Sequence, residues 1–237
     1  AGKAVTSGAN NVLIGGLAGD ALNTGSHNIA IGREALSTET AHGYNIAIGG
    51  YALQDQVAGA DAFNIAIGYQ AGTQINTGIV NTIVGGLAAD ALTTGSENVA
   101  LGYKALSTAT STSNNIAIGS GALENLNYDG ASNNTAVGHN SGNDLTTGVQ
   151  NTFLGSLAGD ALLTGENNVA LGYNTLSTAN TNESGNVAIG ANALKLLDNG
   201  STQYTYNTAV GHSAGLSVST GIQNTLIGGL AGDALTT

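Results

Sequence analysis

A five-residue motif that recurs along the whole chain limits the fold more than any other feature. The motif is Asn, then Ile, Val or Thr, then a variable apolar residue, then Ile, Val or Leu, then Gly. A motif at a near-constant spacing of 17 to 21 residues indicates a repeat architecture in which each unit is one structural module. The thirteen copies begin at Asn11, Asn28, Asn45, Asn64, Asn81, Asn98, Asn115, Asn134, Asn151, Asn168, Asn186, Asn207 and Asn224.

The sequence also has a longer repeat, because four short units together make one long unit. The segment NVLIGGLAGDALNTG at Asn11 returns in close variants at Asn81, Asn151 and Asn224. We therefore predict a single repeat array over residues 1–237. Its long repeats cover 11–80, 81–150 and 151–223, and a partial repeat covers 224–237. Both ends of the sequence lie inside the repeat pattern, so we expect the chain to be a segment of a longer fibre.

Each unit combines a short β-branched run, a segment that contains Ala-Leu, and a polar stretch rich in Thr, Ser, Asn and Gly. β-Branched residues bounded by Gly and Asn favour strands and turns, and no helical period persists through a unit. A unit of 17 residues is too short for a propeller blade or an ankyrin module. The sequence thus predicts an all-β parallel β-solenoid of about thirteen coils of 17–21 residues.

The alternation of side chains along each strand predicts which residues face inward. In the second unit we assign the bulky pair Ile29 and Ile31 to the inside of the coil and Ala30 to the outside. This outer face would then be apolar, which favours burial against another copy of the chain. The same middle position holds a large residue in the first unit of each long repeat, and we predict a subunit interface at these residues: Leu13, Ile83, Phe153 and Leu226.

The invariant Asn and Gly of the motif have structural interpretations. Asn at the start of a strand can hydrogen-bond its own turn and its stacked counterparts in neighbouring coils. The Gly that ends each strand, as at Gly15, Gly32, Gly49 and Gly68, indicates a positive φ or a very close approach between coils.

Composition excludes several classes of partner. Four Lys and Arg against 15 Asp and Glu give a net charge of −11, which argues against nucleic acid. Absence of Cys excludes disulfides, thiolate metal sites and a cysteine nucleophile. The sequence holds no apolar run of the roughly 20 residues that span a bilayer, so we expect no membrane insertion in this segment.

Catalytic candidates are few. His139 and His212 occupy the slot five residues after the motif Asn, which holds Tyr69 in the first long repeat, and we interpret this slot as exposed surface. No Ser/His/Asp constellation is visible, so we predict neither an enzyme nor a cofactor. Hexapeptide acyltransferases remain an alternative, although each coil offers one convincing hexad where those enzymes have three.

Two binding functions are further alternatives. Asp20, Asp90, Asp160 and Asp233 recur at one position of the first unit, and in an oligomer they would form a carboxylate ring able to bind Ca²⁺ if they pointed inward. We favour an exposed or turn-capping role and predict no metal. Ice binding would need a flat threonine ladder. The candidates occur in only some coils, in the expected interior register: Thr82, Thr135, Thr152, Thr208 and Thr225.

The repeated NIAIG, NVALG and NTAVG motifs, followed by an Ala-containing segment, resemble the head repeats of trimeric autotransporter adhesins, and similar repeats occur in phage tail fibres. The resemblance covers essentially the whole chain. It implies a left-handed parallel β-roll, a second short strand in each coil, three copies wound about one axis, and an exposed adhesive or spacer role. The coils here are longer than the usual head repeat, and no neck, coiled-coil stalk or membrane-anchoring barrel is present in the sequence.

From these observations we expect an extracellular structural or adhesive fibre, a homotrimeric rod at a cell surface or on a virion. Its expected partners are further copies of itself and a host-surface glycan or protein receptor. Three variable turns carry much of the aromatic content and are candidates for sugar stacking. Their aromatic residues are Tyr51, Phe63, Tyr128, Tyr204 and Tyr206.

Overall fold

The computed structural model describes residues 1–178, 182–200 and 204–237. It has thirteen short parallel strands in chain order, with no helix among these residues, which confirms the predicted all-β parallel solenoid. The chain divides into two compact units. Unit 1 contains Ala1–Asn115 with Asp129–Ala131, and unit 2 contains Ile116–Tyr128 with Ser132–Thr237.

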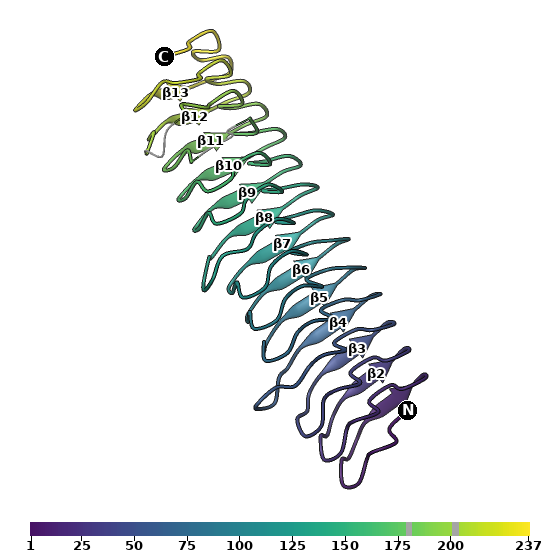
Figure 1. Cartoon of the computed structure of the whole chain (residues 1–237). Coiled ribbons are helices and arrows are strands. Elements are labelled where there is room, and N and C mark those ends of the chain that lie inside the picture. The colour runs from purple at the N-terminus through teal and green to yellow at the C-terminus, as the bar shows by residue number, and fades with distance from the viewer. Residues whose placement is uncertain (179–181, 201–203) are drawn as a thin grey trace. The chain divides into compact units, whose positions relative to one another are not determined.

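Each strand is the three residues between the motif Asn and Gly, and coil n is the coil that contains strand βn (Figure 1). Unit 1 has β1 (Val12–Ile14), β2 (Ile29–Ile31), β3 (Ile46–Ile48), β4 (Ile65–Ile67), β5 (Thr82–Val84) and β6 (Val99–Leu101). Unit 2 has β7 (Ile116–Ile118), β8 (Thr135–Val137), β9 (Thr152–Leu154), β10 (Val169–Leu171), β11 (Val187–Ile189), β12 (Thr208–Val210) and β13 (Thr225–Ile227).

Within each unit, neighbouring strands pair in a register that places the same motif positions side by side. Ala30 lies beside Ala47 in unit 1, and Ala170 lies beside Ala188 in unit 2. The longer coils keep this register, since Val187 still pairs with Thr208, 21 residues later. The extra residues fall in the polar turn before the next Asn, and residues 201–203 of that turn lie outside the described residues.

The Ala-Leu segment that follows each strand is a turn, where the resemblance implied a second strand. Leu36 and Leu53 in this turn have positive φ values of 49° and 48°, which cost energy for a residue with a side chain. Backbone hydrogen bonds to the next coil offset this cost: the Leu36 N–H donates to the Ala52 carbonyl at 3.0 Å and the Leu53 N–H to the Ala71 carbonyl at 3.1 Å. Stacking thus holds a backbone that a lone coil would not adopt.

The motif asparagines form a buried hydrogen-bonded ladder in each unit. In unit 1 the Asn64 Oδ1 accepts from the Asn81 backbone N–H at 2.8 Å, and the Asn81 Nδ2 donates to the Gly95 carbonyl at 3.0 Å. In unit 2 Asn151 relates to Asn168 in the same way. Each side chain therefore joins its own turn to a neighbouring coil, the role that the sequence predicts.

The strand-ending glycines combine both features predicted for them, a positive φ and a very close approach. Gly32 has φ 134°, and a Cβ built on it would lie 2.5 Å from the Gly49 carbonyl oxygen. Because the neighbouring atom is backbone, no side-chain movement could relieve that contact. Coils at a spacing of about 4.8 Å leave no room here for a side chain.

The predicted orientation of the strands is wrong. Ala30 is completely buried within a single chain, whereas Ile29 and Ile31 lie on the outer face and are half-buried. The physical reason is that alanines and leucines of the turn, such as Ala35 and Leu36, already fill the narrow interior, so each strand contributes only its middle residue. The predicted interface at Leu13, Ile83, Phe153 and Leu226 is therefore corrected, because this position points into the coil and Ile83 and Phe153 are fully buried there.

The large middle residues are balanced by small residues across the coil. Most coils with Ala in the strand carry Leu at the facing turn position, as Ala170 faces Leu176, whereas Phe153 faces Gly159. A Cβ on Gly159 would lie 2.7 Å from the Phe153 ring, and one on Gly142 of the preceding coil would lie 2.8 Å from it. A large strand residue is thus exchanged for the Leu of its own coil, and it also fills space in the coil before it.

This exchange predicts the behaviour of a double variant. Phe153→Ala should lower the free energy of unfolding by about 3–5 kcal/mol, because it leaves a cavity. Gly159→Leu alone should also destabilise, through a clash with the ring. The double variant recreates the Ala and Leu pairing of other coils and should recover about half of the loss, as measured by guanidinium unfolding. A double variant no more stable than Phe153→Ala would contradict this account.

The glycine contacts predict a second, position-dependent effect. Gly138→Ala should destabilise the fold by more than about 2 kcal/mol, because its Cβ would meet the Gly155 carbonyl oxygen at 2.4 Å. Gly16→Ala is the matched control, since no atom lies within 4 Å of its Cβ. Thermal unfolding should show a large loss for the first variant and little change for the second. Equal effects would refute the close-approach argument.

Candidate functional surfaces

The outer strand face is the most extended regular surface of each unit. Its side chains come from the first and third residues of every strand, which are aliphatic or Thr in every case and carry no charge. In unit 1 they include Ile14, Ile67 and Val84, at 57%, 36% and 36% exposure. In unit 2 they include Leu154 and Ile227, at 50% and 71%. An uncharged ladder of this kind is unusual on a chain with a net charge of −11.

The predicted interior position of the strand threonines is also wrong. Thr152 and Thr225 lie exposed on the outer strand face, and the other three are half-buried there. Threonine takes only the first of the two outward positions, with Val, Leu or Ile at the other. The continuous threonine array that ice binding would need is therefore missing from these strands.

The repeated aspartates are half-buried and belong to different coils. Asp20 and Asp90 lie four coils apart in unit 1, a separation of about 19 Å, as do Asp160 and Asp233 in unit 2. Residues 1–178, 182–200 and 204–237 hold no group of three or more His, Asp or Glu suited to a metal ion. One chain alone does not bring these carboxylates together.

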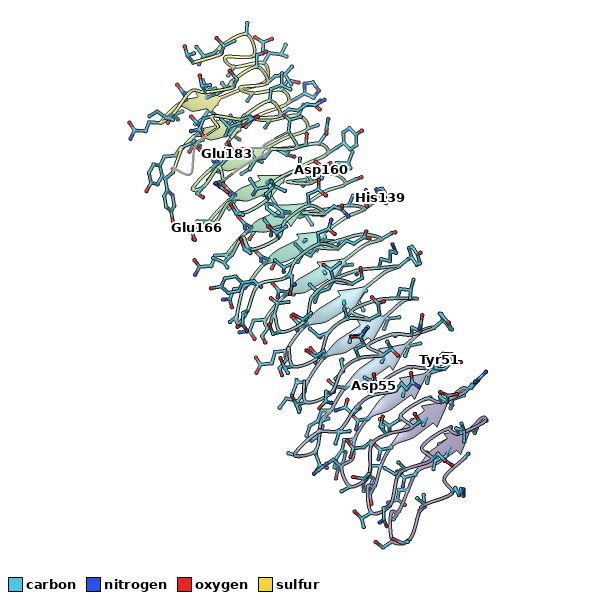
Figure 2. All side chains as sticks on the ribbon, viewed as in Figure 1. Tyr51, Asp55, His139, Asp160, Glu166 and Glu183 are labelled. Carbon is cyan, nitrogen blue, oxygen red and sulfur yellow. The ribbon has the colours of Figure 1, made fainter. Side chains whose placement is uncertain are left out.

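Asp160 has strongly perturbed surroundings. Its Oδ1 is buried and has no hydrogen-bond partner in the described structure (Figure 2). Burial is the main reason that the pKa of Asp160 rises from 3.8 to about 6, and the nearby charge of Asp144 adds to the rise while Lys195 opposes it. Asp160 is therefore a carboxyl group that the fold holds more readily in the protonated form.

Sequence reasoning missed a buried acid in coil 2. Glu39 is fully buried at a position where seven of the other twelve coils carry Leu. Its Oε1 accepts from the backbone N–H groups of Thr40 at 2.8 Å, Ala41 at 3.0 Å and His42 at 3.1 Å, and its Oε2 accepts from Ala58 N–H at 3.1 Å. The carboxylate thus organises the polar turn. Its replacement of a core Leu was the only signal in the sequence.

Two aromatic clusters lie on the polar turns. His27, Tyr44 and Phe63 stack in unit 1 with ring centroids 4.9 and 5.1 Å apart. Tyr204 and Tyr206 stack in unit 2 at 5.2 Å, and the Tyr204 hydroxyl donates to Glu166, which raises the pKa of Tyr204. Two of the three predicted aromatic turns therefore carry partly exposed clusters, with Phe63 and Tyr206 more than half exposed.

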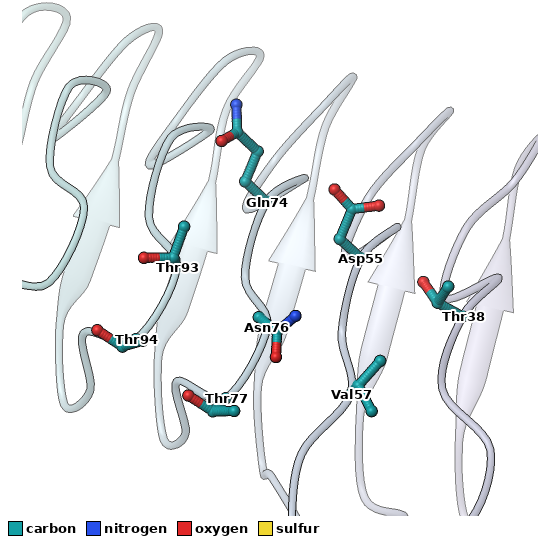
Figure 3. A pocket seen from close by; sticks show the side chains of 8 residues that line it. All are labelled: Thr38, Asp55, Val57, Gln74, Asn76, Thr77, Thr93 and Thr94. Atoms are coloured by element: carbon teal, nitrogen blue, oxygen red, sulfur yellow. The ribbon is translucent and has the colours of Figure 1, made fainter.

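A shallow groove of about 600 Å³ crosses neighbouring coils of unit 1 (Figure 3). It is open, most of its lining residues are of polar types, and none of them is a histidine. His139 and His212, both in unit 2, are exposed as predicted. Figure 2 shows His139 on the outside of its coil. The groove therefore lacks the histidine that an acyltransferase mechanism would need. It is lined by Thr38, Asp55, Val57, Gln74, Asn76, Thr77, Thr93 and Thr94.

Comparisons with known proteins identify no relative of this chain. No family model, curated protein or solved structure matches the chain. Within the described ranges, no helix has the length and apolar character needed to cross a membrane.

The raised pKa of Asp160 predicts a pH dependence of stability. Because the folded-state pKa of about 6 exceeds the ordinary 3.8, the folded state binds the proton more tightly than the unfolded state. This contribution to stability is fully present below about pH 4 and is lost as the pH rises through about 6. Asp160→Asn should remove that decrease and be more stable than the natural chain at about pH 7.5, as measured by denaturant unfolding.

Asp129→Asn is the matched control for charge, because Asp129 is exposed in a variable turn. It should keep the decrease in stability across this pH range. If Asp160→Asn showed the same decrease as the natural chain, the pH dependence would come from other groups.

Proposed function

We propose that the chain is part of an extracellular structural or adhesive fibre that self-associates as a homotrimer through its outer strand faces. The uncharged aliphatic ladder on each unit is the observation that carries this proposal. Exposed to water it would be an aggregation hazard, whereas contact with identical faces would bury it. The resemblance to autotransporter head repeats supports three copies and a location at a cell surface or on a virion.

The distribution of charge supports contact between identical chains. Two copies with a net charge of −11 each repel one another unless their contact surface is neutral. The outer strand positions carry no Asp, Glu, Lys or Arg, so they provide a neutral surface along each unit. Acidic residues such as Asp55 and Asp61 lie instead in the turns, where they favour solubility.

A fibre role also fits the way in which the interior is built. Buried asparagines and small residues fill the coils, and the Asn and Gly contacts repeat from coil to coil. This interior provides rigidity and length without a deep cavity. The acyltransferase alternative has no comparable support, because the groove in unit 1 lacks a histidine.

Sedimentation equilibrium tests the proposal directly. The natural chain should have three times its monomer mass of 23.2 kDa. The double variant Ile48→Lys and Val137→Lys places one charge on the outer strand face of each unit, and it should sediment as a monomer with an unchanged circular dichroism spectrum.

Thr77→Lys with Thr147→Lys is the matched control, because it adds the same charges on exposed turns. This control should remain trimeric. A monomeric natural chain, or a trimer that survives charges on the strand face, would overturn the proposal.

A further inference from the structure

A second periodicity, of two coils, is present at the corner that follows each strand. We call the two residues after the strand-ending Gly the corner pair. Coils with odd numbers begin this pair with a small residue: Gly16, Gly50, Gly86, Ser120, Ser156, Ala191 and Gly229. Coils with even numbers begin it with a planar group, which we call the planar row: Arg33, Tyr69 and Tyr103 in unit 1, and His139, Tyr173 and His212 in unit 2.

The planar groups are exposed, and the small residues make room for them. Tyr69, Tyr103 and Tyr173 are 57%, 55% and 56% exposed. A Cβ on Gly50 would lie 3.6 Å from the Tyr69 ring, and one on Gly86 would lie 3.9 Å from the Tyr103 ring. The Tyr69 and Tyr103 rings therefore lie over the small residue of the preceding coil and leave much of their surface in water.

The second residue of the corner pair follows the same two-coil periodicity. Behind a planar group it carries hydrogen-bonding capacity, as in Gln70, Lys104 and Asn174. Behind a small residue it is Leu in four of seven coils: Leu17, Leu87, Leu157 and Leu230. Each even coil thus presents a flat group beside a polar side chain, and Leu87 and Leu157 each place an apolar patch between two such pairs.

The backbone holds this pattern rigidly. The N–H of Leu87 donates to the Tyr69 carbonyl at 2.9 Å, and the N–H of Lys104 donates to the Gly86 carbonyl at 3.2 Å. In unit 2 the N–H of Asn174 donates to the Ser156 carbonyl at 3.0 Å. Corner pairs therefore repeat at the coil spacing, and successive planar groups within a unit are about 10 Å apart.

We propose that the planar row binds an extended polysaccharide, with its sugar rings stacked on the aromatic faces. The distance between successive planar groups is about the length of two sugar residues in an extended chain, so one ring would meet every second sugar. Aromatic rings pack against the apolar faces of sugars, and neighbouring amide and charged groups hydrogen-bond the hydroxyl groups. This inference deepens the proposed adhesive role and rests on it.

The alternatives explain the pattern less well. Rings that served only to cover the backbone would not need to be more than half exposed or to have polar neighbours. A second copy of the chain is the proposed occupant of the strand face, and the corner pairs lie beyond the glycine that ends this face. Arg33 and Lys104 add positive charge to the row of unit 1, which permits acidic as well as neutral polysaccharides.

Calorimetric titration with defined oligosaccharides tests the proposal. The probes are cellohexaose and chitohexaose as neutral chains, hexagalacturonate as an acidic chain, and the disaccharide of each. At least one hexasaccharide should bind about tenfold more tightly than its disaccharide, because it spans several planar groups. Each Tyr→Ala substitution at Tyr69, Tyr103 or Tyr173 should weaken binding about three- to tenfold, and the triple variant should abolish it.

Ile222→Ala is the matched control, because Ile222 is 54% exposed but lies outside the row. It should bind like the natural chain. Absence of binding to every probe, an unaffected triple variant or an equal loss in the control would overturn the proposal. So would a triple variant that sediments as a monomer, since the row would then be a contact between chains. Binding that persists in a naturally monomeric chain would separate this result from failure of the proposed trimer.

Discussion

The hydrogen bond that the motif asparagine side chain accepts from the backbone of the next coil is the interaction on which the rest of the structure depends. It places a polar side chain inside an apolar coil, where an unmet donor or acceptor would be costly. Asn64 is satisfied only because Asn81 and the Gly78 carbonyl lie at the correct spacing. The register of the strands, the close approach at the glycines and the positive φ values of the turns all follow from that spacing.

Sequence alone predicted the repeat, the parallel strands and the roles of Asn and Gly, because these depend on residues that every coil shares. It failed on the strand faces, since the alternation of Ile29, Ala30 and Ile31 is the same whichever face points inward. The decisive information was nonlocal: the turn residues already fill most of the coil, so each strand turns its single middle residue inward and its bulky pair outward. Glu39 was missed for a related reason, because its partners are backbone groups of its own turn and of Ala58 in the next coil.

The outer strand face and the corner pairs have different proposed roles. The outer strand face is uniform and uncharged, which suits contact with identical neighbours. The corner pairs alternate and carry rings, amides and charges, which suits recognition of a repeating ligand. The variable turns carry the aromatic residues that the sequence offers for ligand contacts, yet the regular corner offers the more ordered array. The two-coil periodicity of the corner is visible in the sequence at Tyr69 and Tyr103, but its geometry depends on Gly50 and Gly86 in the preceding coils.

The exchange of large and small residues across the coil has a consequence for how such a chain can change in length. Phe153 fills space beside its own Gly159 and beside Gly142 of the preceding coil, so these coils are not interchangeable. Gain or loss of one coil by recombination would put two large residues or two small ones side by side. Only a block of four coils keeps the same large and small residues side by side in adjacent coils. Such a block also preserves the two-coil periodicity of the corner. Evolution can therefore lengthen this solenoid without repacking it in steps of about 70 residues.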